Sequence, residues 1–140
     1  MKVVIDTNIF VSSFSINSEF HGIFRGLMEG QYQLLVSNAI VLEYREIMAE
    51  KYGVEGGLVF EDILKTAPNV IHSEPFINWQ IIDKDPDDNK FADCAICSGA
   101  DFIVTNDKHF KEVKNNKFPP MKVINMNEFL KILRGNSKTI

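Results

Sequence analysis

Short apolar runs rich in β-branched residues alternate along this chain with longer segments of helical periodicity. The apolar runs predict strands at residues 3–5, 33–36, 70–71, 102–104 and 121–124. The longer segments predict helices at residues 19–28, 37–52, 55–66, 88–98 and 127–133. Strands that alternate with helices favour a parallel sheet covered on both faces. We therefore expect an α/β fold, a three-layer α/β/α sandwich with a mostly parallel central sheet of about five strands.

Polar and turn-forming residues mark the ends of these elements. Helix N-caps are predicted at Ser18 and Ser37, and helix ends at Gly30, Gly53 and Gly99. Residues 12–17 are polar enough to form a loop. Residues 72–87 contain Pro75 and Pro86, which break regular structure, so a long irregular segment precedes the helix at 88–98.

The length of 140 residues suits one domain, which we expect at residues 1–134 with a flexible tail at 135–140. No secretion signal precedes Asp6 and no apolar run is long enough to cross a membrane, so we expect a cytoplasmic protein without a membrane partner. Cys94 and Cys97 are expected to be small buried thiols on a helix. Ordinary surface or core roles are expected for the scattered histidines His21, His72 and His109.

The net charge of the chain narrows the range of possible functions. A net charge of −4 and a pI of about 5.3 argue against a sequence-independent nucleic-acid binder, because such proteins present a basic surface. The same balance is compatible with an enzyme whose acidic centre is neutralised by divalent cations.

Four acidic residues occupy positions that such a fold can bring together. Asp6 ends the first strand and Asp107 lies just past the fourth. Glu43 lies one turn into the helix after the second strand, and Asp88 begins the helix after the long loop. Strand ends and the starts of the following helices share one edge of a parallel sheet, where ligands bind. This arrangement favours a metal site.

Carboxylate oxygens suit the hard cations Mg²⁺ and Mn²⁺, which can activate water and polarise a phosphodiester. Without a cation, clustered carboxylates repel one another and one is forced towards protonation. Each acid also has an ordinary interpretation: Asp88 as a helix cap, Glu43 as a solvated acid or a partner of Arg45, and Asp107 as the start of a turn. Only the four together favour the metal site.

Three segments around these acids resemble the PIN-domain ribonucleases, in particular the VapC-like toxins of toxin–antitoxin pairs. The matching segments are residues 4–8 (VIDTN), 85–91 (DPDDNKF) and 99–110 (GADFIVTNDKHF), with Glu43 after the first. The resemblance runs over nearly all of residues 1–128. It implies an endoribonuclease that hydrolyses RNA phosphodiester bonds with Mg²⁺ or Mn²⁺ and acts as a toxin. It also implies an antitoxin partner encoded by a neighbouring gene and pairing into a homodimer.

The resemblance also implies roles by position. Catalysis and metal binding fall to Asp6, Glu43, Asp88 and Asp107, and supporting roles fall to Asn8 and Thr105. The third acid stays open, because Asp87 is adjacent to Asp88 and Asp93 lies on the same helix, about 140° around it. Both Asp87 and Asp93 are therefore alternative metal ligands.

A basic run follows the last acid, at Lys108, Lys111, Lys114 and Lys117. Its ordinary interpretation is a solvated face, and the alternative is that Lys108 and Lys111 bind RNA phosphates. Phe76 and Trp79 in the long loop likewise have two interpretations, stacking on bases or packing against the domain.

Two other function classes stay open. A receiver-like phosphoacceptor signalling domain is also α/β with acids at strand ends, but it requires paired acids directly after the first strand. Here Asp6 is followed by Thr7 and Asn8. A catalytically inactive PIN fold would serve only as a binding module, and the presence of all four acids argues against it.

Overall fold

The structure, a computed structural model, describes residues 1–82, 86–115 and 120–137. Its strands are β1 (Lys2–Ile5), β2 (Gln33–Val36), β3 (Val70–His72), β4 (Phe102–Val104) and β5 (Val123–Ile124). Its helices are α1 (Thr7–Ser13), α2 (His21–Glu29), α3 (Asn38–Thr66), α4 (Asn89–Ser98), α5 (Lys111–Lys114) and α6 (Met126–Ser137). Two short 3₁₀ helices, η1 (Pro86–Asp88) and η2 (Lys108–Phe110), directly precede α4 and α5.

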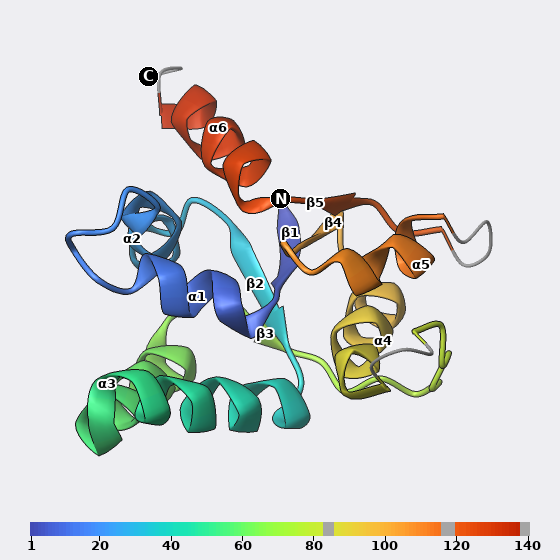
Figure 1. The fold of residues 1–140 in the computed structure, drawn as a ribbon, viewed down its shortest axis with the longest axis horizontal. Coiled ribbons are helices and arrows are strands. Elements are labelled where there is room, and N and C mark those ends of the chain that lie inside the picture. The colour runs from blue at the N-terminus through green and yellow to red at the C-terminus, as the bar shows by residue number, and fades with distance from the viewer. Residues whose placement is uncertain (83–85, 116–119, 138–140) are drawn as a thin grey trace.

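The five strands form one parallel sheet in the order β3-β2-β1-β4-β5. Strand β1 lies at the centre, with Ile5 opposite Val104 of β4. Helix α4 packs on β1, β2 and β4, whereas α1 and α6 pack against α2 on the other side of the sheet (Figure 1). The predicted three-layer α/β/α sandwich is confirmed.

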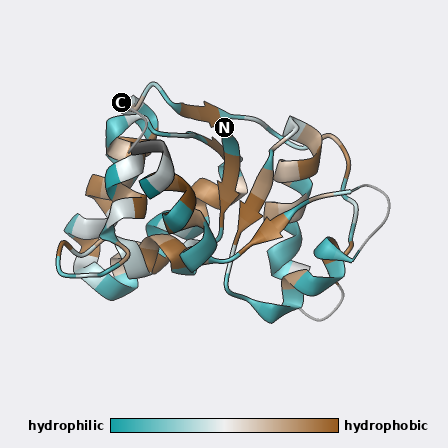
Figure 2. Cartoon of the chain, turned by 90° about the horizontal axis from the view of Figure 1, so that it is seen from above, coloured by the Kyte–Doolittle hydropathy of each residue, from teal (hydrophilic) through white to brown (hydrophobic). Residues whose placement is uncertain are grey.

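Apolar strands occupy the middle of the molecule, and the surrounding helices carry many polar residues (Figure 2). A buried aromatic cluster joins α1 to both halves of α3: Phe10 makes edge contacts with Tyr44 at 5.2 Å and Phe60 at 5.1 Å between ring centroids. The Tyr44 hydroxyl donates a hydrogen bond to the Ile5 carbonyl oxygen. This bond fixes the first turns of α3 beside the end of β1.

Most predicted element ends agree with the structure. The Ser37 hydroxyl caps α3 by accepting a hydrogen bond from the Ile40 N–H at 3.3 Å. The backbone at Gly53 has a φ of 83°, so α3 is kinked there, where the sequence predicts that one helix ends and another follows. Left-handed Gly30 and Gly99 end α2 and α4.

Helix α1 is not predicted by the apolar pattern, and it shortens the expected loop at 12–17. The helix buries two polar residues, Thr7 and Ser13, as well as apolar ones, so it lacks a clear apolar stripe. Those polar groups are satisfied, because Thr7 donates to Glu43 and Ser13 donates to the Phe10 carbonyl oxygen at 3.3 Å.

Three further features differ from the predictions. Part of the basic run folds into η2 and α5, held by the buried side chains of Phe110 and Val113. Strand β5 begins at Val123, two residues later than expected. Helix α6 continues to Ser137, past residue 135 where we expected a tail, and residues 138–140 of that tail lie outside the described residues. Within the described parts of the chain, no helix is long and apolar enough to cross a membrane.

Candidate metal centre

The centre is built where the neighbouring parallel strands β1 and β4 end. The Asp6 N–H continues the sheet by donating to the Val104 carbonyl oxygen at 2.9 Å. One residue past β4, the buried Thr105 hydroxyl donates to Oδ2 of Asp6 at 2.7 Å. The sheet register therefore holds the Asp6 carboxylate and its hydrogen-bond donor in fixed positions.

Asp6 is a buried acid, with 5% of its surface exposed. Although it occupies the N-cap position of α1, its side chain makes no capping hydrogen bond. Burial raises its pKa from 3.8 to about 6, and the negative charges of Glu43 and Asp107 also raise it, whereas the Thr105 hydrogen bond lowers it. A cation beside Asp6 would relieve this cost by favouring the ionised form.

Glu43 reaches the centre from α3 and is held from two sides. The buried Thr7 hydroxyl, from the first turn of α1, donates a hydrogen bond to Oε2 of Glu43. From α4, Nζ of Lys90 lies 2.7 Å from Oε1 of Glu43, and each of these two side chains is about a quarter exposed. Arg45, the partner considered from the sequence, pairs instead with Glu61 at 3.1 Å.

Asp107 both shapes a turn and faces the centre. Its Oδ1 caps η2 by accepting from the His109 N–H at 2.9 Å, which is the turn role expected from the sequence. The Asp107 N–H donates to Oγ1 of Thr105 at 3.0 Å. Thr105 thus links Asp6 and Asp107 through one hydroxyl group.

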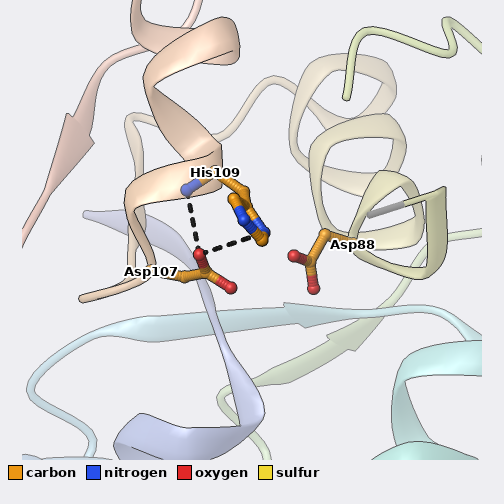
Figure 3. A group of neighbouring side chains, drawn as sticks. All are labelled: Asp88, Asp107 and His109. Atoms are coloured by element: carbon orange, nitrogen blue, oxygen red, sulfur yellow. Dashed lines mark hydrogen bonds and ion pairs between the residues drawn. The ribbon is translucent and has the colours of Figure 1, made fainter. Parts of the chain in front are cut away.

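Asp88 is the last residue of η1 and the N-cap of α4, but its side chain makes no capping hydrogen bond. Its carboxylate points across to Asp107 and His109 (Figure 3). One ligand atom from each of these three residues lies within 4.8 Å of the other two. The structure therefore brings Asp88 to the centre, and His109 with it.

The two alternative third acids have different surroundings from Asp88. Asp87 is exposed. Asp93 is buried on α4 and accepts a hydrogen bond from the Trp79 N–H at 2.9 Å. Burial raises the pKa of Asp93, and the Trp79 hydrogen bond lowers it. Asp93 is therefore an anchor for the loop before η1, on another face of α4 from the acid at its N-cap.

The remaining predicted site residues lie at the edge of the centre. Asn8 is exposed on α1, two residues past Asp6. Lys108 and Lys111 are exposed and line a cavity of about 410 Å³ that also reaches Asp107. The part of the basic run from Lys108 to Lys114 therefore lies next to Asp107. Lys117 lies outside the described residues.

The donor set fits a hard divalent cation. The charges of Glu43 and Asp107 both act on Asp6, and Asp107 has a ligand atom within 4.8 Å of one from Asp88, so the four acids are linked in pairs. Oxygen ligands of this kind suit Mg²⁺ and Mn²⁺. His109 adds a ring nitrogen, with its Nδ1 3.5 Å from Oδ1 of Asp107.

Sequence reasoning missed three residues of this centre: Thr7, Lys90 and His109. Each lies close in the sequence to a predicted acid. Thr7 directly follows Asp6, Lys90 follows Asp88 by two residues, and His109 follows Asp107 by two. Their contacts join different elements, however, so no periodicity within one element indicates them.

Comparisons with known proteins identify the family and the fold of the chain. The family model for the PIN domain matches residues 2–109, a range that contains all four acids. No curated protein matches the chain.

The solved structures that share its fold include the following two. A chain from the crystal structure of VapBC2 from Rickettsia felis, bound to a DNA fragment from their promoter, is 18% identical with a TM-score of 0.62, and the match covers 89% of this chain and 98% of that one. The PIN domain of human SMG5 is 11% identical with a TM-score of 0.54, and the match covers 94% and 98%. Because the family model matches most of its length, the chain belongs to the PIN-domain family.

Proposed function

We propose that this protein is a metal-dependent endoribonuclease whose centre is formed by Asp6, Glu43, Asp88 and Asp107. The observation that carries the proposal is the buried Asp6 carboxylate, whose pKa is raised to about 6 within a connected group of acids. Such a group is costly to the fold and becomes useful when it binds a cation. PIN domains are generally nucleases, which supports the same reaction class.

The proposed cofactor is Mg²⁺ or Mn²⁺, held by the four carboxylates. When bound, such an ion lowers the pKa of water and stabilises negative charge on a phosphodiester. Thr105 keeps the Asp6 carboxylate in place through its 2.7 Å hydrogen bond. Thr7 of α1 and Lys90 of α4 both hold the Glu43 carboxylate in place. These contacts preorganise the oxygen ligands, which lowers the cost of assembling the site.

The substrate proposed is RNA, and the lysines beside Asp107 support a backbone-binding role. Lys108, Lys111 and Lys114 are exposed along one cavity at this edge of the centre. Ammonium groups attract phosphates irrespective of base sequence. They give an acidic protein a local basic surface where the substrate must approach the carboxylates.

The proposed biological role is that of a toxin with an antitoxin partner. The fold similarity to a chain of the VapBC2 structure supports this assignment. The partner should be a small protein encoded beside this chain, and its addition should block cleavage. Uninhibited cleavage in the presence of every neighbouring gene product would contradict the toxin role but not the nuclease. A homodimer and a cytoplasmic location stay predictions.

The strand order weighs against the receiver-like alternative. Receiver-type sheets follow the order 2-1-3-4-5, whereas here β1 lies between β2 and β4 in the order β3-β2-β1-β4-β5. A phosphoacceptor role therefore loses its structural basis as well as its paired acids.

Cleavage of a labelled single-stranded RNA with Mn²⁺ tests the proposal. We expect cleavage by the wild-type protein, none after chelation of the metal, and a loss of about a hundredfold or more in Asp6→Asn. Asp62→Asn is the matched control, because Asp62 is exposed on α3. Equal cleavage by Asp6→Asn and the control would contradict the proposal. Absence of both cleavage and a Mn²⁺-dependent thermal shift would favour the inactive binding module.

A further inference from the structure

A second cavity shares no lining residue with the cavity at Lys108 and Lys111, and it reaches the metal centre at Lys90. It has a volume of about 510 Å³ and is formed by the start of α3, the loop before η1 and the first half of α4. Its polar lining includes Ser37, Glu74, Asn78, Gln80, Lys90 and Asp93. Both its size and its mixture of apolar walls with a few polar groups are typical of small-ligand sites.

The loop that forms one wall, residues 73–82, is fastened to α4 by side chains of that helix. Asn89 holds both backbone groups of Ile82, accepting from its N–H at 2.8 Å and donating to its carbonyl at 3.0 Å. Asp93 accepts from the Trp79 N–H, and the Cys97 thiol contacts the Ile77 carbonyl oxygen at 3.7 Å. The cavity wall is therefore preformed and does not depend on a ligand for its order.

The other end of the loop is fastened to α3. Oε1 of Glu74 accepts a hydrogen bond from the Asn38 N–H at 2.5 Å, in the first turn of the helix that carries Glu43. The loop thus bridges the two helices that supply acids to the centre, since Asp88 is the N-cap of α4.

Lys90 connects this cavity to the metal centre. It lines the cavity, while its Nζ lies 2.7 Å from Oε1 of Glu43. A group bound in the cavity is therefore separated from the acids by one side chain. A base of a strand whose phosphate lies at the acids would therefore meet this cavity across Lys90.

Two amide side chains are placed to recognise such a base. Asn78 and Gln80 both line the cavity and both are exposed to solvent. An amide offers a donor and an acceptor, which suits the edge of a nucleobase. Gln80 has a φ of 53°, and no other non-glycine residue in the described parts of the chain has a positive φ. The Gln80 backbone at the cavity therefore adopts a conformation that is rare for glutamine. Residues in such conformations are concentrated at ligand-binding and active sites.

We propose that this cavity binds one unpaired nucleobase of the RNA substrate, next to the phosphodiester that is cleaved. The inference rests on the proposed ribonuclease function. It assigns the two cavities different tasks: the cavity at Lys108 and Lys111 binds the phosphate backbone, and the cavity at Asn78 and Gln80 binds a base. The apolar lining residues Ala39, Pro75 and Ile82 supply surfaces against which a base can pack.

The test uses the fluorescence of Trp79, which is the single tryptophan of the chain and lies between Asn78 and Gln80. Single-stranded RNA octamers are titrated into Asp6→Asn protein with Mg²⁺, so that binding is measured without cleavage. We expect a saturable change in Trp79 fluorescence. An abasic octamer with the same sugar–phosphate backbone should bind more weakly, by about tenfold, and leave the fluorescence unchanged.

Variants locate the binding site. Adding Asn78→Ala and Gln80→Ala should each weaken octamer binding by about three- to tenfold, the effect of one lost hydrogen bond. Asn17→Ala is the matched control, an exposed asparagine outside the cavity, and it should bind like the parent. Circular dichroism checks that each variant is folded.

The outcomes separate this inference from the proposed function. Base-dependent binding at Trp79 by a protein whose wild-type form cleaves no RNA would support the base site and contradict the nuclease. Cleavage by the wild type with equal binding of normal and abasic octamers, or with Asn78→Ala and Gln80→Ala as tight as Asn17→Ala, would overturn the base site alone. Failure to bind any octamer would also overturn it.

Discussion

The ammonium of Lys90 lies 2.7 Å from the carboxylate of Glu43, and this ion pair joins α4 to α3 across the acidic centre. Both side chains are mostly shielded from water, so the pair is more than a surface contact. Without a metal, Lys90 is the positive charge nearest to Glu43 among the ion pairs of the described residues. The protein therefore supplies part of the charge compensation that a divalent cation would complete.

Replacing Lys90 with methionine should reveal this compensation. In metal-free solution we expect Lys90→Met to lower the free energy of unfolding by about 1 kcal/mol, because Glu43 loses its counter-charge. Addition of Mn²⁺ should then raise the melting temperature more in the variant than in the wild type. Lys65→Met is the control, because Lys65 is an exposed lysine of α3 that pairs with Glu61 instead of with one of the four acids. Equal Mn²⁺ shifts in Lys90→Met and wild type would contradict the account.

The raised pKa of Asp6 predicts an unusual stability effect. A folded-state pKa of about 6 against 3.8 means that native Asp6 holds its proton where the unfolded chain has lost it. Stability therefore falls as pH rises from about 4 to 6, and above that the ionised carboxylate costs about 3 kcal/mol. Without metal at pH 8, Asp6→Asn should thus be more stable than wild type by up to about 3 kcal/mol.

Urea denaturation in a chelating buffer measures this difference. The gain in Asp6→Asn should fall close to zero below about pH 3, where the wild-type carboxyl is mostly protonated in both states. The exposed Asp62→Asn control should show no such pH dependence. An Asp6→Asn protein no more stable than wild type at pH 8 would show that the buried acid is not under electrostatic stress.

The choice of third acid predicts a ranking of three variants in metal affinity. Asp88→Asn should weaken Mn²⁺ binding by about tenfold or more, because its carboxylate faces Asp107. Asp87→Asn should leave the affinity unchanged. Asp93→Asn should also leave it unchanged but should alter Trp79 fluorescence, because it disturbs the anchor of the loop. Calorimetric titration gives the three affinities, and a larger loss in Asp93→Asn than in Asp88→Asn would reverse the assignment.

The lysines beside Asp107 predict the salt dependence of RNA binding. Replacing Lys108, Lys111 and Lys114 together by alanine should reduce the slope of log affinity against log salt by about 2, because each contact with single-stranded RNA contributes about 0.7. A control with Lys51, Lys65 and Lys131 replaced keeps the net charge equal to that of the test variant while sparing the cavity. If both triple variants change the slope equally, the lysines act only through overall charge.

Much of the fold follows from local sequence. The short apolar runs at Val3–Ile5 and Phe102–Val104 are rich in β-branched residues and bounded by turns, so they predict buried strands. In the structure these strands pair in parallel and bring Asp6 and Thr105 together. Gly53 ends the first half of α3 because its positive φ is accessible to glycine. The strands and the helix end can therefore be predicted from residues that are close together in the sequence.

The parts that sequence reasoning missed depend on contacts between elements. Thr7 is buried on α1 because Glu43 of α3 accepts its hydrogen bond. Lys90 faces the centre because the Glu43 carboxylate attracts it. The sequence alone does not distinguish this paired Glu43 from a solvated one. His109 joins the acids through the 3₁₀ turn that Asp107 caps. The side chains that complete the site are thus positioned by tertiary structure.

The most direct measurement is the anomalous-scattering map of crystals soaked in Mn²⁺. The account predicts a peak within about 2.5 Å of carboxylate oxygens from Asp6, Asp88 and Asp107, with Glu43 bound directly or through water. It also predicts that the peak is lost in Asp6→Asn crystals. A peak at Asp93 or Asp87 in place of Asp88, or no peak at the four acids at saturating Mn²⁺, would contradict it.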